Sequence, residues 1–128
     1  MFFLKTKYIQ KFLAKKGVKN TDLSPVITEL IKGKGSSLGS NLYKIRMKDE
    51  HQGKSGAYRT IWFWKRKELV ILCFFFPKNV MGNITTKEKK ALKLLSKSWN
   101  QLKEHQILKL IKLGEMARID YDPKKISS

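Results

Sequence analysis

Four basic residues occupy positions from which a folded sheet could gather them around one phosphate. In the segment "LYKIRMK" (residues 42–48) apolar and basic residues alternate, so the basic ones share one face of a strand. A cluster of cations on such a face can hold a phosphodiester and stabilise the charge that builds up during in-line attack. Cleavage of RNA by its own 2′-OH needs neither a metal nor a protein nucleophile. The four candidates for this catalytic role are Lys44, Arg46, Arg59 and Lys78.

A second interpretation of the same basic row is purely structural. Sheet edges commonly carry charged side chains, because charge opposes edge-to-edge aggregation of strands. The residue pattern alone favours neither interpretation over the other.

The segment "HQGKSGAYRT" (residues 51–60) has the look of a phosphate-binding loop. A nucleotide-binding loop of this kind needs a glycine five positions before its second glycine, and a helix directly after it. Position 48 is lysine, and a strand pattern follows the segment instead. We therefore exclude a nucleotide cradle, and Lys54 is left as a point charge that could meet a phosphate.

Other catalytic chemistries find little support in the sequence. His51 and His105 are far apart, and no cysteine or histidine pair has metal-ligand spacing, so we expect neither a metal nor a cofactor. Cys73 lies in an apolar run and is predicted to pack in the core. His51 falls in a polar loop, where it is either an ordinary exposed histidine or a general acid or base.

An aromatic group lies between the basic positions. Such rings can stack on nucleobases, but at strand spacing they are typical of a core. The group consists of Tyr58, Trp62, Phe63 and Trp64.

The charge balance points to a polyanionic partner. The chain has 128 residues, with 28 Lys and Arg against 10 Asp and Glu, for a net charge of +18. A field of this strength favours nucleic acid or an acidic protein. No apolar segment approaches the ~18 residues of a membrane span. "MFFL" is too short for a signal peptide, and the lone cysteine fits a reducing compartment, so we expect a cytoplasmic protein.

Hydrophobic periodicity predicts an α+β chain. The expected fold has two N-terminal helices packed on a small twisted, mostly antiparallel sheet, followed by C-terminal helices. A short strand is predicted at residues 2–4. The first helix runs from Thr6 to Gly17, and the second begins near Asp22 or Ser24 with Pro25 in its first turn.

We expect one domain over residues 1–128, since neither a linker nor an internal repeat is visible. Thr85 and Glu88 predict a capping box, and a last helix is predicted at residues 105–113. The expected parts are the N-terminal strand and helices at 2–33, the sheet at 42–78, the C-terminal helices at 85–114 and a frayed tail at 121–128.

Several segments together resemble the RelE-type toxins of bacterial toxin–antitoxin systems. They are "LGSNLYKIRMK", "GKSGAYRT" and "CFFFPKNVMGNIT" leading into "KALKLL", in that order. The likeness is to the RelE/HigB-like branch of the RelE/ParE superfamily, and it extends over almost the whole chain. It implies a RelE-like fold and an endoribonuclease that cleaves mRNA in the ribosomal A site, leaving a 2′,3′-cyclic phosphate. It also implies a cognate antitoxin protein as partner.

The resemblance assigns the phosphate-orienting roles to the same four basic residues. Lys48, Lys54 and Asn79 are then predicted to contact RNA. RelE carries a tyrosine past its last strand, where this chain has "VMGNITT", and an arginine where this chain has Asn79. Proton transfer is therefore open among Tyr58, His51 and Lys54.

An alternative function belongs to a different class. The chain could be a non-enzymatic toxin that binds nucleic acid or seizes a protein, as in the gyrase-directed ParE branch. An enzyme needs its cations within reach of one phosphate, whereas a binding module can spread them along a nucleic-acid backbone.

Overall fold

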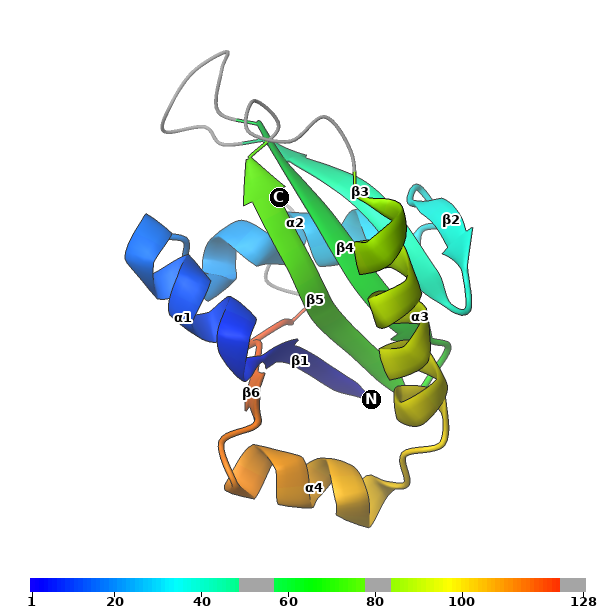
Figure 1. The fold of residues 1–128 in the computed structure, drawn as a ribbon. Coiled ribbons are helices and arrows are strands. Elements are labelled where there is room, and N and C mark those ends of the chain that lie inside the picture. Colours follow the sequence, from blue (N-terminus) through cyan, green and yellow to red (C-terminus); the bar gives the residue numbers. More distant parts are fainter. Residues whose placement is uncertain (49–56, 78–83, 123–128) are drawn as a thin grey trace.

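The computed structural model describes residues 1–48, 57–77 and 84–122. They form a six-stranded mixed sheet in the order β2-β3-β4-β5-β1-β6, with helices on both faces (Figure 1). The strands are β1 (Phe2–Thr6), β2 (Ser36–Gly39), β3 (Leu42–Lys48), β4 (Ala57–Lys65), β5 (Leu69–Pro77) and β6 (Met116–Arg118). The helices are α1 (Lys7–Lys16), α2 (Asn20–Ile31), α3 (Thr86–Asn100) and α4 (Glu104–Lys112). No helix in these ranges is long and apolar enough to cross a membrane.

The predicted arrangement of helices and strands is wrong. The short strand predicted at residues 2–4 is present as β1, but it lies inside the sheet between β5 and β6 instead of preceding helices that pack on a separate sheet. It runs parallel to β5 and antiparallel to β6, and β6 follows the last helix, so the sheet is mixed and its strands come from both ends of the chain. The physical reason is that β1 makes its hydrogen bonds with residues 69–72 and 116–118, and local periodicity carries no information about such distant partners.

Two apolar clusters lie on the two faces of the sheet. Helices α1 and α2 cover one face, which we call the rear face, and α3 lies across the other, the front face (Figure 1). The rear cluster contains Ile9, Leu13, Leu23, Val26, Ile27, Leu30, Ile45, Met47, Tyr58, Trp62, Trp64, Val70, Leu72, Phe75 and Ile119. The front cluster contains Leu4, Leu42, Ile61, Phe63, Leu69, Ile71, Cys73, Leu92, Trp99, Ile107 and Met116.

The first two helices differ in how well the sequence predicted them. Helix α1 ends at Gly17, which adopts the left-handed conformation with φ 71°, as predicted. Helix α2 begins at Asn20, earlier than expected, because the Asp22 carboxylate accepts a hydrogen bond from the Lys19 N–H at 2.8 Å and closes the helix start. Pro25 therefore lies inside the helix and not in its first turn, so that prediction was wrong.

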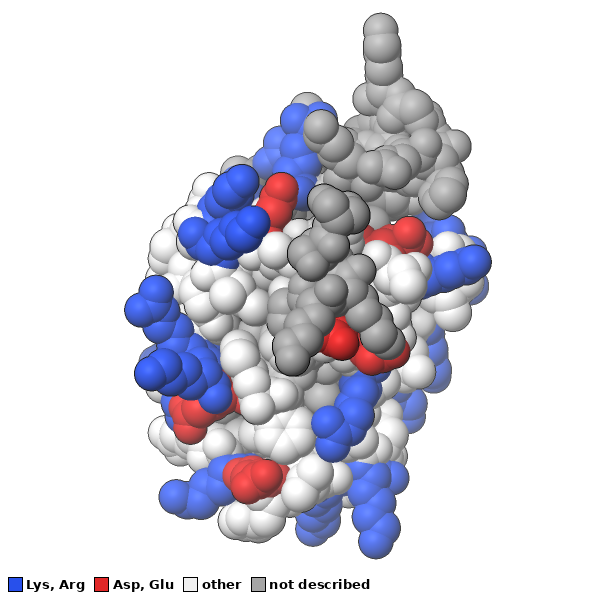
Figure 2. Space-filling model, turned by 180° about the vertical axis from the view of Figure 1, so that it is seen from behind, with Lys and Arg blue, Asp and Glu red and all other residues white. Residues whose placement is uncertain are grey.

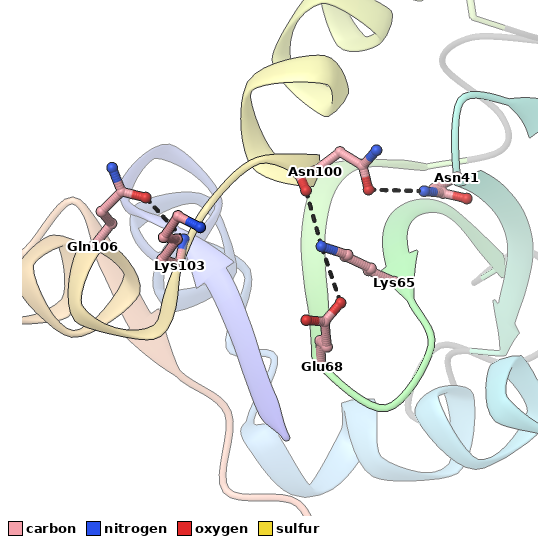
Figure 3. A network of polar contacts seen from close by, with 6 residues as sticks. All are labelled: Asn41, Lys65, Glu68, Asn100, Lys103 and Gln106. Atoms are coloured by element: carbon pink, nitrogen blue, oxygen red, sulfur yellow. Dashed lines mark hydrogen bonds and ion pairs between the residues drawn. The ribbon is translucent and has the colours of Figure 1, made fainter.

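Helix α3 is fixed to the sheet at its carboxyl end (Figure 3). The Lys65 Nζ donates a hydrogen bond to the Asn100 carbonyl oxygen at 2.9 Å and forms an ion pair with Glu68 at 3.0 Å. The Asn41 side-chain amide donates to the Asn100 side-chain oxygen at 3.3 Å. A cation at the last helix carbonyls satisfies an orphan acceptor and complements the helix dipole. These contacts join the end of α3 to β4 and to the residue that precedes β3.

A β-bulge interrupts the pairing of β4 with β5. Ile61 lies opposite Phe74, whereas its neighbour Trp62 lies opposite Leu72, so Cys73 is the extra residue. Cys73 and Phe74 both pack into the front cluster, while Leu72 and Phe75 belong to the rear cluster. The bulge therefore reverses the alternation of side chains along the last part of β5.

The end of the described chain packs back onto the molecule. Tyr121, at the first position of the predicted tail, has its hydroxyl 2.8 Å from that of Thr28, and its ring lies 4.7 Å from that of Phe3. Residues 123–128 of the predicted tail lie outside the described residues.

Candidate phosphate-binding site

Two arginines lie side by side on the front face of the sheet. Arg46 of β3 is the direct cross-strand partner of Arg59 of β4. Arg46 stands between Ile45 and Met47 in the chain, and both of these pack in the rear cluster, so the Arg46 side chain points to the front. Direct partners in an antiparallel pair share a face, with Cβ atoms about 4.5–5.5 Å apart. The two guanidinium groups can therefore reach one bound anion.

Lys44 adds a third cation to the same face. It precedes Arg46 by two residues on β3 and lies opposite Ile61, a member of the front cluster. Its side chain and that of Arg59 are half-buried, and that of Arg46 is exposed. The structure thus brings together three of the four basic residues predicted from the sequence.

No carboxylate among the described residues forms an ion pair with these three cations. The salt bridge found among the described residues joins Lys65 and Glu68, and Lys65 lies at the opposite end of β4 from Arg59. Like charges directly opposite each other in a sheet are destabilising. Among the described residues the arginine pair has no acidic partner, so a bound anion would relieve the repulsion between them.

Of the remaining predicted site residues, the structure describes two and leaves four outside the described ranges. Lys48 is the last residue of β3 and pairs with Ala57. Tyr58 lies on the rear face, 5% exposed, with its ring 4.7 Å from that of Phe75, away from the arginine face. Lys78, His51, Lys54 and Asn79 lie outside the described residues.

The central aromatic residues and the cysteine belong to the core, as predicted. Trp62 and Phe63 are fully buried. Burial raises the pKa of the Cys73 thiol to about 12, and its Sγ donates a hydrogen bond to the Ile61 carbonyl oxygen at 3.2 Å. Because the thiolate is the reactive form, a neutral thiol held in this way is inert at physiological pH.

Sequence reasoning missed two aromatic residues beside the arginines. Phe76 lies directly opposite Arg59, and Phe74 lies opposite Ile61, so both share the arginine face. Uninterrupted alternation along β5 would have sent both rings to the rear. Predicting the correct face for Phe74 and Phe76 would have required knowledge of the bulge at Cys73. The bulge arises from the pairing of β5 with β4, and the sequence of β5 alone does not reveal it.

Positive charge outside the arginine face also favours an anionic ligand, but it is not concentrated on one face. On the side opposite to the view of Figure 1, cationic side chains are spread around the margin, with acidic ones between them (Figure 2). Within the described ranges no group of three or more His, Cys, Asp or Glu side chains could hold a metal ion. Lys44, Arg46 and Arg59 are therefore distinguished by their shared register and by the absence of an acidic partner in the described part of the chain, and not by charge density alone.

Comparison with known families agrees with the resemblance in the sequence. The family described as the RelE toxin of the RelE/RelB toxin–antitoxin system matches residues 1–119. No individual curated protein matches the chain. A toxin of this family implies a cognate antitoxin as partner. With a match over nearly its whole length, the chain belongs to the RelE family and is a toxin of a toxin–antitoxin system.

Proposed function

We propose that this toxin is an endoribonuclease that cleaves mRNA, and that Arg46, Arg59 and Lys44 hold the scissile phosphate. The observation that carries the proposal is the cross-strand arginine pair on one face, without a carboxylate partner among the described residues. Guanidinium groups suit this role because each can donate two parallel hydrogen bonds to phosphate oxygens.

The reaction would be a transesterification within the RNA. The 2′-oxygen attacks the adjacent phosphorus while the bond to the 5′-oxygen breaks, giving a 2′,3′-cyclic phosphate and a 5′-hydroxyl. One proton leaves the 2′-OH and one reaches the departing oxygen. Of the three candidates predicted from the sequence, His51 and Lys54 remain for this role, because the third, Tyr58, is buried on the opposite face of the sheet. Negative charge grows on the phosphoryl oxygens in the transition state, and preorganised cations stabilise it most there. Lys78 is the fourth predicted contributor to that stabilisation.

The substrate would be single-stranded message presented by the ribosome. A net charge of +18 attracts the chain to ribosomal and messenger RNA, which both carry dense negative charge. The ribosomal A site would supply an extended strand whose backbone can enter the arginine face. The specificity for translated message then comes from the ribosome and not from base-edge contacts of the protein.

Mapping of RNA 5′ ends after brief induction tests this function. The wild type should create new ends inside translated frames, and Arg59→Ala should lower their yield about 100- to 1,000-fold, the usual effect of removing one transition-state donor. Arg66→Ala is the matched control. It removes the same charge from the β4–β5 turn, where Arg66 lies 5.6 Å from the Trp64 ring centre, and it should cleave like the wild type.

Two outcomes of the 5′-end mapping would contradict the proposed function in different ways. A folded Arg59→Ala variant with undiminished cleavage would remove Arg59 from the mechanism. Intact messages in cells whose growth is still arrested by the wild type would replace the enzymatic function with a protein target, such as DNA gyrase.

A further inference from the structure

The bulge in β5 places aromatic rings beside the proposed phosphate site. Bulges re-aim side chains and are over-represented near functional sites. Here the extra residue, Cys73, turns Phe74 and Phe76 onto the face that carries Arg46 and Arg59. Across three neighbouring strands this face presents Arg46, Arg59 and Phe76 in one row. The next row holds Lys44, Ile61 and Phe74.

Phe74 and Phe76 differ in their access to solvent. Phe76 is 4% exposed, whereas Phe74 is half-buried and retains open surface. The two rings meet edge to face with centroids 5.2 Å apart, so Phe76 supports Phe74 and limits its rotation. Figure 1 shows α3 lying across β3 and β4, with no helix drawn in front of the carboxyl-terminal half of β5.

The position of Phe74 relative to the arginines suits one nucleotide. Phe74 lies diagonally from Arg59 across the β4–β5 pair, a relation that spaces Cα atoms by about 7–8 Å and lets long side chains meet. Single-stranded nucleic acids are bound by cations along the backbone together with aromatic rings on which bases stack. A phosphate on the arginines would place its neighbouring base over this part of β5.

We propose that Phe74 is a stacking platform for a nucleobase of single-stranded RNA whose adjacent phosphate is held by Arg46 and Arg59. The proposal rests on the proposed ribonuclease function for the identity of the ligand. Phe74 acts as a positioning residue, since its ring fixes the nucleotide and takes no part in bond breaking. Stacking of this kind tolerates any base, because every base has a π face.

A fluorescent RNA tests the stacking directly. The probe is a short single-stranded RNA with 2-aminopurine placed at each position in turn and 2′-O-methyl groups at the other positions, which block cleavage there. At one position the wild type should quench the fluorescence. Phe74→Leu, which keeps an apolar side chain against Ile61, should lose that quenching at saturation and bind about tenfold more weakly. Phe74→Tyr should restore both quenching and affinity.

Two controls separate stacking from a loss of folding. Phe12→Leu alters another half-buried phenylalanine, on α1 beneath the rear face, and should leave the quenching unchanged. An RNA that lacks the base at the quenched position should bind equally to the wild type and to Phe74→Leu, since nothing is left to stack. If Phe74→Leu still binds the abasic RNA more weakly than the wild type does, the substitution acts through the structure of the protein, and the proposal is overturned.

The test also distinguishes this proposal from the one on which it rests. Absent quenching in the wild type, or full quenching in Phe74→Leu, overturns the platform even if Arg59→Ala abolishes cleavage in cells. Conversely, base-dependent quenching that needs Phe74, together with intact messages in cells, supports the platform and removes the ribonuclease function.

Discussion

Arg46 and Arg59 form a pair that opposes folding and that, in the proposed function, binds the scissile phosphate. Cross-strand neighbours of opposite charge contribute roughly 0.2–1 kcal/mol of stability, and like charges act against folding. The chain nevertheless places two of its four arginines directly opposite each other. Residues kept against their own effect on stability are typical of functional sites. The pair is therefore best understood through the anion that it can bind.

Removal of one charge from the pair should separate stability from activity. Arg46→Gln keeps most of the side-chain length and ends the repulsion, so the free energy of unfolding should stay unchanged or rise by about 0.2–1 kcal/mol. RNA cleavage by the same variant should fall. Urea unfolding monitored by tryptophan fluorescence measures the first quantity, and the yield of new RNA 5′ ends measures the second.

Arg118→Gln provides the contrast for that experiment. Arg118 lies on β6 with its guanidinium 5.3 Å from the centre of the Phe2 ring, a cation–π contact worth about 0.5–1 kcal/mol at an exposed site. Its loss should lower stability and leave cleavage intact. A drop in stability for Arg46→Gln as large as that for Arg118→Gln would contradict the repulsion argument.

Helix α3 is the element that keeps the front face in its shape. Its amino end is closed by a capping box in which the Thr85 hydroxyl accepts from the Glu88 N–H and the Glu88 carboxylate accepts from the Thr85 N–H. Its carboxyl end is held by Lys65 through the Asn100 carbonyl (Figure 3). Between these ends, Trp99 packs edge to face on Phe63 with centroids 5.7 Å apart. The helix is therefore capped at its amino end and joined to the sheet at its carboxyl end and along its apolar side.

Loss of the amino-terminal cap should weaken the fold by a predictable amount. Thr85→Ala removes the hydroxyl that satisfies the Glu88 N–H and should lower the free energy of unfolding by about 1 kcal/mol. Thr86→Ala, one residue into the helix, makes the same chemical change without touching the cap and should change stability much less. Chemical denaturation of both variants checks the difference, and equal losses would show that the box contributes little.

At the scale of the whole molecule, most of the positive charge is dispersed. Dispersed charge attracts RNA without positioning it. The chain carries a net charge of +18, and the rear view shows cations dispersed over that face and around its margin (Figure 2). Dispersed charge accelerates encounters with polyanions and is screened by salt within about 10 Å at 0.1 M. Lys44, Arg46 and Arg59 add to this diffuse charge a fixed register on one face of the sheet. Association and positioning of RNA should therefore respond differently to mutation.

The salt dependence of RNA binding measures this division. For a single strand, each phosphate contact contributes a slope of about 0.7 to the fall of log affinity with log salt. Arg59→Ala should reduce the total slope by about that amount, because a defined phosphate contact is lost. Arg66→Ala should leave the slope near its wild-type value. Identical slopes for the two variants would indicate diffuse binding without a phosphate site.

Local patterns in the sequence determined much of this architecture. The alternation in residues 42–48 put Lys44 and Arg46 on one face, and the structure confirms that face. Gly17 ended α1, and Thr85 with Glu88 began α3, because caps act within four residues and need no distant partner. Family membership likewise followed from the order of short segments along the chain.

The tertiary structure alone decided which strands became neighbours and how they were aligned. Nothing near residues 2–6 indicates that β1 lies between β5 and β6, and the predicted order of helices and strands was wrong for that reason. Likewise, β3 does not reveal that Arg46 faces Arg59, and β5 does not reveal the bulge that turns Phe74 toward them. Side-chain alternation and capping depend on residues a few positions apart. Register depends on backbone hydrogen bonds between segments distant in sequence, and these form only when the whole sheet does.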